Sequence, residues 1–145
     1  MSSIPCPRCS TPLDPCDIEG VPVDRCPTCT GMLVEQKHLS GWIDALVKLM
    51  GPIGEDTPIQ VVPDAHGIAS CPDCGAAMER FGYLEARVVT LDRCRPCQLV
   101  WIDEGELPTM VAMVGRSSAR ANAQLHEIEE LGRRLSAMFR SRVRG

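Results

Sequence analysis

The chain has 145 residues, 44% of them hydrophobic and only 3% aromatic, and it contains nine cysteines. This length allows one domain or two very small ones, and halves of about 60 residues bury too little apolar surface to be stable without disulfides or metal ions. The chain lacks both a secretion-signal pattern at its start and an apolar run long enough to span a membrane. We therefore expect a cytoplasmic protein whose paired cysteines stay reduced and bind metal.

The charge is unevenly distributed. Residues 1–115 carry eight Lys or Arg and sixteen Asp or Glu, a net charge of −8, whereas residues 116–145 carry seven Arg and three Glu, a net charge of +4. Only the C-terminal segment therefore has a charge that suits a polyanion such as nucleic acid. Its basic residues are Arg116, Arg120, Arg133, Arg134, Arg140, Arg142 and Arg144.

The cysteines belong to an internal repeat. A Cys-Pro-x-Cys pair at Cys6 is followed after sixteen residues by a second pair, and another such pair at Cys71 is followed after nineteen residues by a fourth. The copies also agree outside the cysteines, since Leu33 aligns with Trp101 and Glu35 with Asp103. This agreement indicates a duplicated unit.

Each copy combines extended and helical patterns. Residues 20–24 and 83–91 favour extended chain, so we expect a short antiparallel hairpin in each copy. Apolar residues then recur at helical spacing over 39–50 and 107–114. Asp103 and Glu106 resemble a capping box, but Pro108 favours a helix start near Leu107.

These patterns predict four segments. They are a first unit over residues 1–50, a linker rich in turn formers and acids over 51–70, a second unit over 71–115 and a basic C-terminal helix over 116–145.

The C-terminal helix has an apolar side. Ile128, Leu131, Leu135 and Met138 follow one another at spacings of 3, 4 and 3 residues. Two heptads are fewer than the three or four that support a coiled coil. This helix could pack on its own body, pair with a second copy as a homodimer, or bind a partner protein, and we favour the first.

The cysteine spacing is typical of metal binding. A Cys-x-x-Cys turn directs two sulfurs at one point, and two such turns complete a tetrahedron of thiolates around a divalent ion, for which zinc is the expected occupant. Because protein fills all four positions, we expect structural rather than catalytic sites, whose binding free energy of about 10–16 kcal/mol would decide whether the units fold. Iron, thioredoxin-like redox chemistry and disulfides are weaker alternatives. The predicted ligands are Cys6, Cys9, Cys26 and Cys29 for one ion and Cys71, Cys74, Cys94 and Cys97 for the other.

The remaining reactive residues are isolated. Cys16 has no counterpart in the second copy, where Phe81 takes its place, so we expect a small apolar or surface thiol. We expect His38 on a helix surface, and His66 and His126 stand alone. The sequence contains no apparent catalytic triad, glycine-rich phosphate loop or pair of catalytic acids, so we expect no enzyme.

Residues 6–40 and 71–108 resemble the TFIIB-type zinc-ribbon family of bacteria. The resemblance rests on the cysteine pairs, on a Val-Asp-x-Cys or Leu-Asp-x-Cys segment and on the run from Trp101 to Leu107, for which the first copy has a degenerate version. The first copy keeps Gly31 after its last cysteine, whereas Gln98 and Leu99 follow the last cysteine of the second. The resemblance implies zinc-ribbon folds and structural zinc on the eight cysteines, and little about activity.

Together these features predict a small metal-stabilised α+β protein: two tandem zinc ribbons built on short antiparallel hairpins, each followed by a helix, plus the C-terminal helix. We expect an adaptor that binds macromolecules through its ribbons and that helix. The alternative is a transcription-related protein that contacts nucleic acid or RNA polymerase through the seven C-terminal arginines. Two zinc–thiolate centres would make the body still more acidic, which disfavours phosphate binding there.

Overall fold

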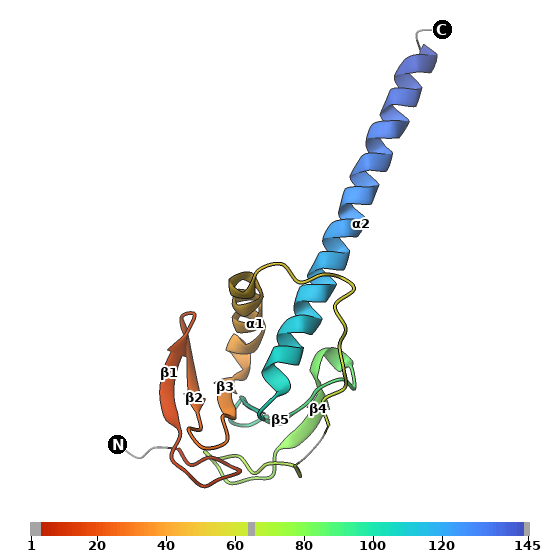
Figure 1. Ribbon diagram of the computed structural model, residues 1–145. Helices are drawn as coiled ribbons and strands as arrows, with labels where there is room; N and C mark the ends of the chain where they lie inside the picture. Colours follow the sequence, from red (N-terminus) through yellow and green to blue (C-terminus); the bar gives the residue numbers. More distant parts are fainter. Residues whose placement is uncertain (1–3, 64–65, 144–145) are drawn as a thin grey trace.

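A computed structural model of the chain describes residues 4–63 and 66–143, with no account of the side chains of 141–143. The described chain forms one antiparallel sheet with two helices against one face, and the second helix extends far beyond the body (Figure 1). In chain order the elements are β1 Asp14–Ile18, β2 Val21–Arg25, β3 Met32–Glu35, α1 Gln36–Met50, β4 Glu79–Gly82, a short 3-10 turn Tyr83–Glu85, β5 Thr90–Cys94, β6 Leu99–Ile102 and α2 Glu106–Val143.

The two copies share one sheet. Its strand order is β1-β2-β3-β6-β5-β4, so each copy contributes three strands and β3 pairs with β6 at the centre. In that pairing Met32 lies opposite Ile102, and Val34 lies opposite Val100. The two ribbons are therefore not separate units joined only by a linker, in contrast to the prediction, because the central ladder connects them by backbone hydrogen bonds.

Side chains of the central strands alternate between two apolar layers. Met32, Val34, Val100 and Ile102 face the helices and pack in the larger core, which includes Trp42. On the opposite face, Leu33 and Trp101 pack among the cysteines in a second cluster. Because successive residues of a strand point to opposite faces, both layers follow from the short apolar runs in β3 and β6.

The hairpins differ between the copies. β1 and β2 are joined by Glu19 and Gly20, both of which have positive φ, as in the tight turns that suit hairpin twist. The predicted extended chain over 83–91 is wrong in its first part, since Tyr83–Glu85 form a 3-10 turn in which Leu84 has a φ of 55°. The three extra residues of the second copy therefore enlarge this loop, which buries Tyr83 in the core.

The helix α2 begins at Glu106, one residue before its predicted start. The Glu106 side chain accepts a hydrogen bond of 2.9 Å from the backbone N–H of Asp103, which closes the turn that precedes the helix, so Asp103 and Glu106 do not form the expected capping box. Pro108 is tolerated because it lies in the first turn, where backbone N–H groups have no acceptor within the helix. The helix then continues through the predicted boundary between residues 115 and 116 without a break.

The C-terminal half of α2 does not pack on the body, so our favoured expectation for it is wrong. Gly115 is buried against Ile53, and Arg116 donates a hydrogen bond of 3.3 Å to the carbonyl of Thr57. Over residues 120–140, every residue except Ala123 is exposed, and the helix projects into solvent (Figure 1). The described body is shorter than α2 along the helix axis, so it does not contact the C-terminal half of the helix.

The linker partly covers the body. Ile53 and Val62 pack against the larger core, and the Val62 N–H donates a hydrogen bond to Val88. Ala69 is buried on the cysteine face. Neither helix in the described part of the chain has an apolar stretch long enough to cross a bilayer.

Candidate metal centres and the polar network between them

The eight predicted ligands come together in two groups of four. In each group the sulfur atoms all lie within 4.8 Å of one another. The Sγ atoms of Cys6 and Cys29 are 3.7 Å apart, and those of Cys74 and Cys94 are 3.6 Å apart. Four sulfurs bound tetrahedrally at a zinc–sulfur distance of about 2.3 Å would be about 3.8 Å from one another. Each group is therefore suited to hold one zinc ion.

All four cysteine turns place a residue with positive φ at the fourth position after the first cysteine. These residues are Ser10, Thr30, Gly75 and Gln98. In three turns, the N–H of this residue donates to the carbonyl of the first cysteine, at 2.9 Å for Ser10 and 2.8 Å for Gly75. In the fourth turn, Gln98 instead donates to the carbonyl of Arg95, next to Pro96. The turns thus position the sulfurs by local backbone geometry.

The two cysteines of a pair differ in burial. The first of each pair, Cys6, Cys26, Cys71 and Cys94, is buried, whereas the second is more accessible. The buried cysteines pack in the same cluster as Leu33 and Trp101. Each metal ion would therefore lie at the edge of an apolar layer, with protein sulfur filling all four positions, as in structural sites.

The thiols in one cluster have opposed tendencies to ionise. Burial disfavours the Cys26 thiolate, but the N–H groups of Cys29 and Thr28 outweigh it and lower the Cys26 pKa to about 7. Burial raises the pKa of Cys29 to about 12. Four thiolates this close require a cation to offset their mutual repulsion, which is what a bound zinc ion supplies.

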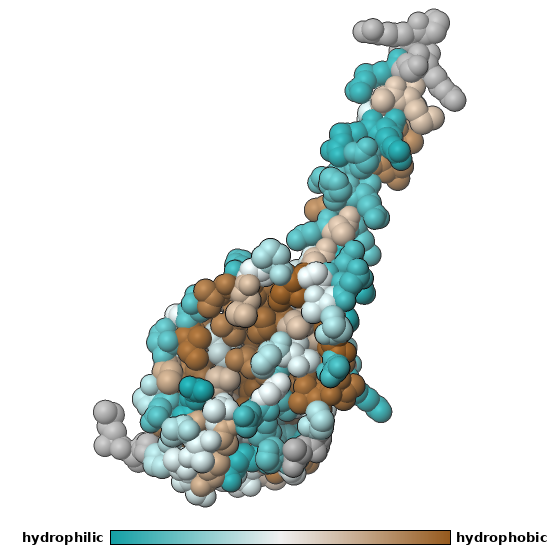
Figure 2. Space-filling model, in the orientation of Figure 1, coloured by the Kyte–Doolittle hydropathy of each residue, from teal (hydrophilic) through white to brown (hydrophobic). Residues whose placement is uncertain are grey.

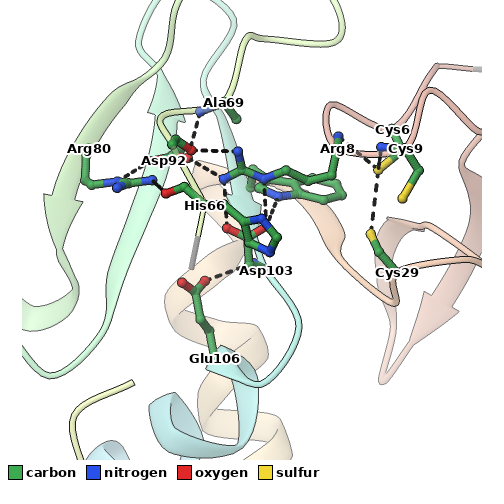
Figure 3. A network of polar contacts seen from close by, with 12 residues as sticks. Cys6, Arg8, Cys9, Cys29, His66, Ala69, Arg80, Asp92, Asp103 and Glu106 are labelled. Carbon is green, nitrogen blue, oxygen red and sulfur yellow. Dashed lines mark hydrogen bonds and ion pairs between the residues drawn. The ribbon is translucent and has the colours of Figure 1, made fainter. Parts of the chain in front are cut away.

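A polar network connects the two ribbons on the cysteine face (Figure 3). Arg8 lies between the two ligands of the first pair and reaches across to the second copy. Its guanidinium forms a two-pronged ion pair with Asp103, at 3.0 and 2.9 Å, and a third contact of 3.2 Å with Asp92. It also donates a hydrogen bond of 2.6 Å to the carbonyl of Gly67.

Asp92 is the buried centre of this network. Its side chain is 2% exposed and also accepts hydrogen bonds from Arg80 at 3.0 Å and from the backbone N–H of Ala69 at 3.0 Å. A buried carboxylate is stable only when it is paired and hydrogen-bonded, and these partners meet that condition. The network therefore holds a strand of the second ribbon, the end of the linker and the first cysteine turn together.

Asp103 and Glu106 ionise differently. Burial alone would raise the pKa of Asp103, but hydrogen bonds from Arg8 and from the Trp101 indole, the latter at 2.8 Å, hold this pKa below its usual value. Glu106 lacks a cationic hydrogen-bond partner in the described chain, and burial together with the nearby Asp103 and Asp92 raises its pKa to about 8. Glu106 is thus a buried acid that is largely protonated near neutral pH.

Sequence analysis missed this network. The repeat alignment singled out Asp92 and Asp103, but nothing in the sequence pairs them with Arg8, which lies more than eighty residues away. The one available signal was the variable position inside the first cysteine pair, which is Arg8 in the first copy and Asp73 in the second.

Cys16 and His38 lie where they were expected, whereas His66, expected to stand alone, belongs to the network, since its carbonyl accepts a hydrogen bond of 3.1 Å from Arg80. Cys16 is a partly buried thiol on β1, opposite Val23, and Phe81 occupies the matching place opposite Leu91. His38 lies on the surface of α1, 3.4 Å from Glu35. Of the seven C-terminal arginines, Arg144 lies outside the described residues, and the side chain of Arg142 is not described.

Comparison with known proteins supports the assignment of the first ribbon. Residues 5–45 match the sequence model of the TFIIB-type zinc-ribbon family, described as a transcription factor zinc-finger. The second cysteine cluster lies outside the matched segment, although the expected resemblance was stronger there. Neither the curated proteins nor the solved structures include a match to this chain. Residues 5–45 are thus similar to the zinc ribbons of this family, in a small α+β protein whose two four-cysteine groups are suited to hold zinc.

Proposed function

We propose that this protein is a non-enzymatic adaptor of the cytoplasm that binds other macromolecules, with two zinc ions stabilising the body that carries its binding surfaces. Closed four-sulfur sites support a structural role for the metal, because they leave no position for substrate. Reduced thiols, which such sites require, persist in the cytosol.

The observation that carries this proposal is the exposed half of α2. Six large apolar side chains between Leu125 and Phe139 are 42–66% exposed. Figure 2 shows brown, hydrophobic areas along the projecting helix. Most of the stability of protein helices comes from packing of an apolar face, and a contiguous exposed apolar side is typical of a segment that another macromolecule covers. These residues are Leu125, Ile128, Leu131, Leu135, Met138 and Phe139.

A specific observation also favours the alternative, contact with nucleic acid or a transcription complex. At 100° per residue, Arg133 and Arg140 fall on the side of α2 opposite its apolar residues and Arg134 lies on the flank, whereas Arg120 falls at the same angle as Met138. Arg133 is engaged by Glu130 at 2.7 Å, and Glu127 lies on the same flank as Arg134, which weakens the positive potential around these arginines. The acidic body would oppose phosphate binding, so any such contact would be confined to α2.

The two functions are separated by binding experiments on the full, zinc-loaded chain. We expect Leu135→Asp, on the apolar side, to lose protein partners that co-purify with the wild type, whereas Glu129→Lys, on the polar side, retains them. If both variants retain every partner, the apolar side has no adaptor role.

The nucleic-acid alternative predicts instead a gel shift of DNA or RNA oligonucleotides that weakens with salt and is lost in Arg134→Glu. A shift that is absent at low salt removes this alternative.

A further inference from the structure

We propose that the exposed half of α2 pairs with the same segment of a second copy of this chain, with the two helices antiparallel. This inference rests on the proposed function, since it names the occupant of the apolar side described above. It differs from that proposal in committing to self-association and to one orientation.

The apolar side has the pattern of a helix–helix seam. If Ile128 and Leu135 are assigned to position a of a heptad, Leu131 and Met138 occupy position d, and all four are exposed. Leu125 and Phe139 fall at position e and widen the seam on one flank. The short length of the seam does not favour a long coiled coil, but six large side chains in four turns form a compact contact.

An antiparallel pairing matches large side chains with small ones. We choose the register in which Ile128 of one helix lies beside Leu131 of the other. In this register Met138 lies beside Ala121 of the other helix. On the flank of the seam, Leu125 lies beside Gly132. Nothing lies within 4 Å of a methyl group placed on Gly132, so the chain has open space where the opposing Leu125 would enter. Packing in which side chains of one helix fill gaps on the other is the normal basis of such contacts.

Charge selects the same orientation locally. The other flank, position g, contains Glu127 and Arg134. In an antiparallel pair, position g of one helix faces position g of the other. Glu127 of each chain therefore lies beside Arg134 of the other chain, and this ion pair occurs twice. In parallel helices position g faces position e, and there Arg134 would lie beside Phe139 without a charged partner.

Charge selects it globally as well. Residues 132–145 contain five Arg and no acid, while residues 1–115 have a net charge of −8. A helix of 38 residues separates these ends by about 57 Å. Parallel pairing would bring the two basic ends together and the two acidic bodies together, whereas antiparallel pairing brings each basic end toward the opposing body and also opposes the helix dipoles.

The test uses sedimentation of the purified, zinc-loaded full chain. We expect wild type to be a dimer, and Glu127→Arg and Arg134→Glu each to weaken self-association roughly tenfold at low salt, because each replaces two attractive pairs by two repulsive ones. Mixing the two variants restores the dimer, since a mixed antiparallel pair again places opposite charges together at both sites.

Glu129→Arg is the matched control, because it makes the same charge change on the polar side and leaves the dimer intact. Zinc content and helical circular dichroism verify that every variant is folded. A wild-type chain that is monomeric at all concentrations, or variants that fail to rescue one another on mixing, would overturn the antiparallel pair. A monomeric chain that still loses protein partners on Leu135→Asp would leave the adaptor function standing.

Discussion

Leu33 and Trp101 lie directly opposite each other on the two central strands of the sheet. They are also equivalent positions of the two repeats, so an approximate twofold axis passes between them. The same axis relates the flanking pairs, since Met32 faces Ile102 and Val34 faces Val100. The duplicated chain thus forms the symmetric contact that two separate copies would form in an isologous dimer.

Each copy departs from the family pattern at one of two positions that meet across this axis: the first copy has Leu33 in place of the tryptophan, and the second has Leu99 in place of the glycine. A methyl group on Gly31 would overlap the six-membered ring of Trp101. The first ribbon therefore keeps its glycine because the second keeps its tryptophan. The second ribbon has Leu99 at the matching position, and the residue that corresponds to Trp101 is the smaller Leu33.

Gly31→Ala should destabilise the protein by about 1–3 kcal/mol, because the added methyl group overpacks a buried site. Unfolding by urea at fixed zinc concentration measures this free energy. In a protein that already carries Trp101→Leu, Gly31→Ala should cost less than it does in the wild type, because the ring that the methyl group would overlap is gone. Gly41→Ala is the control, since that position is exposed on α1 with open space around it, and there alanine should stabilise by about 0.5–1 kcal/mol.

Arg8→Ala should cost about 3 kcal/mol, because it leaves the buried carboxylate of Asp92 and the half-buried one of Asp103 without their shared cation. Arg8→Lys should recover only a fraction, since an ammonium group cannot form the two-pronged pair. The matched control is Arg95→Ala, which breaks an exposed pair with Glu79 and should cost at most about 1 kcal/mol. Equal costs for Arg8→Ala and Arg95→Ala in urea unfolding would show that the network has no special role.

Purified protein should contain two zinc ions, and chelation should unfold it. Because both clusters pack against Leu33 and Trp101, the sites should be coupled: Cys71→Ser should empty the second site and also weaken zinc binding at the first, by roughly tenfold if the coupling is about 1.4 kcal/mol. Competition with a chromophoric chelator measures this affinity, with Cys16→Ser as a control that leaves both sites unchanged. A first site of unaltered affinity would mean that the ribbons are energetically independent.

Stability should fall as pH rises from about 4.5, the ordinary pKa of a glutamate, to about 8, and should then level off. The folded-state pKa of Glu106 is about 8, above its value in the unfolded chain, so the folded protein holds a proton that must be lost as pH rises. Glu106→Gln cannot ionise and should flatten this part of the profile, so that its melting temperature rises relative to wild type by up to about 4 °C per unit between pH 6 and pH 8, with no further gain at higher pH. Parallel wild-type and variant profiles would contradict the assigned burial of the acid.

The metal sites were predictable because they depend on local chemistry. Four Cys-x-x-Cys turns in two equal sets specify two sulfur tetrahedra without any knowledge of the fold. The helix over residues 36–50 was equally predictable from the spacing of Leu39, Trp42, Ile43 and Leu46. The loop after β4 was not, since β-branched residues at 88–90 suggested extended chain, whereas burial of Tyr83 in the core decides the path.

Long-range contacts, in contrast, could not be predicted from a single sequence. The two ribbons join in one sheet because the edge strand β3 pairs with the edge strand β6. The sequence of an apolar edge strand does not specify which other strand it will pair with. Arg8 and Asp92 are distant in sequence and meet only because that pairing brings the first cysteine turn over the second ribbon. The projecting half of α2 follows from geometry, because a straight 38-residue helix is far longer than the small body on which it begins. Periodicity and composition thus suffice for the chemistry of the cysteines and for the helices, whereas the shared core and the free helix arise from how the folded elements fill space.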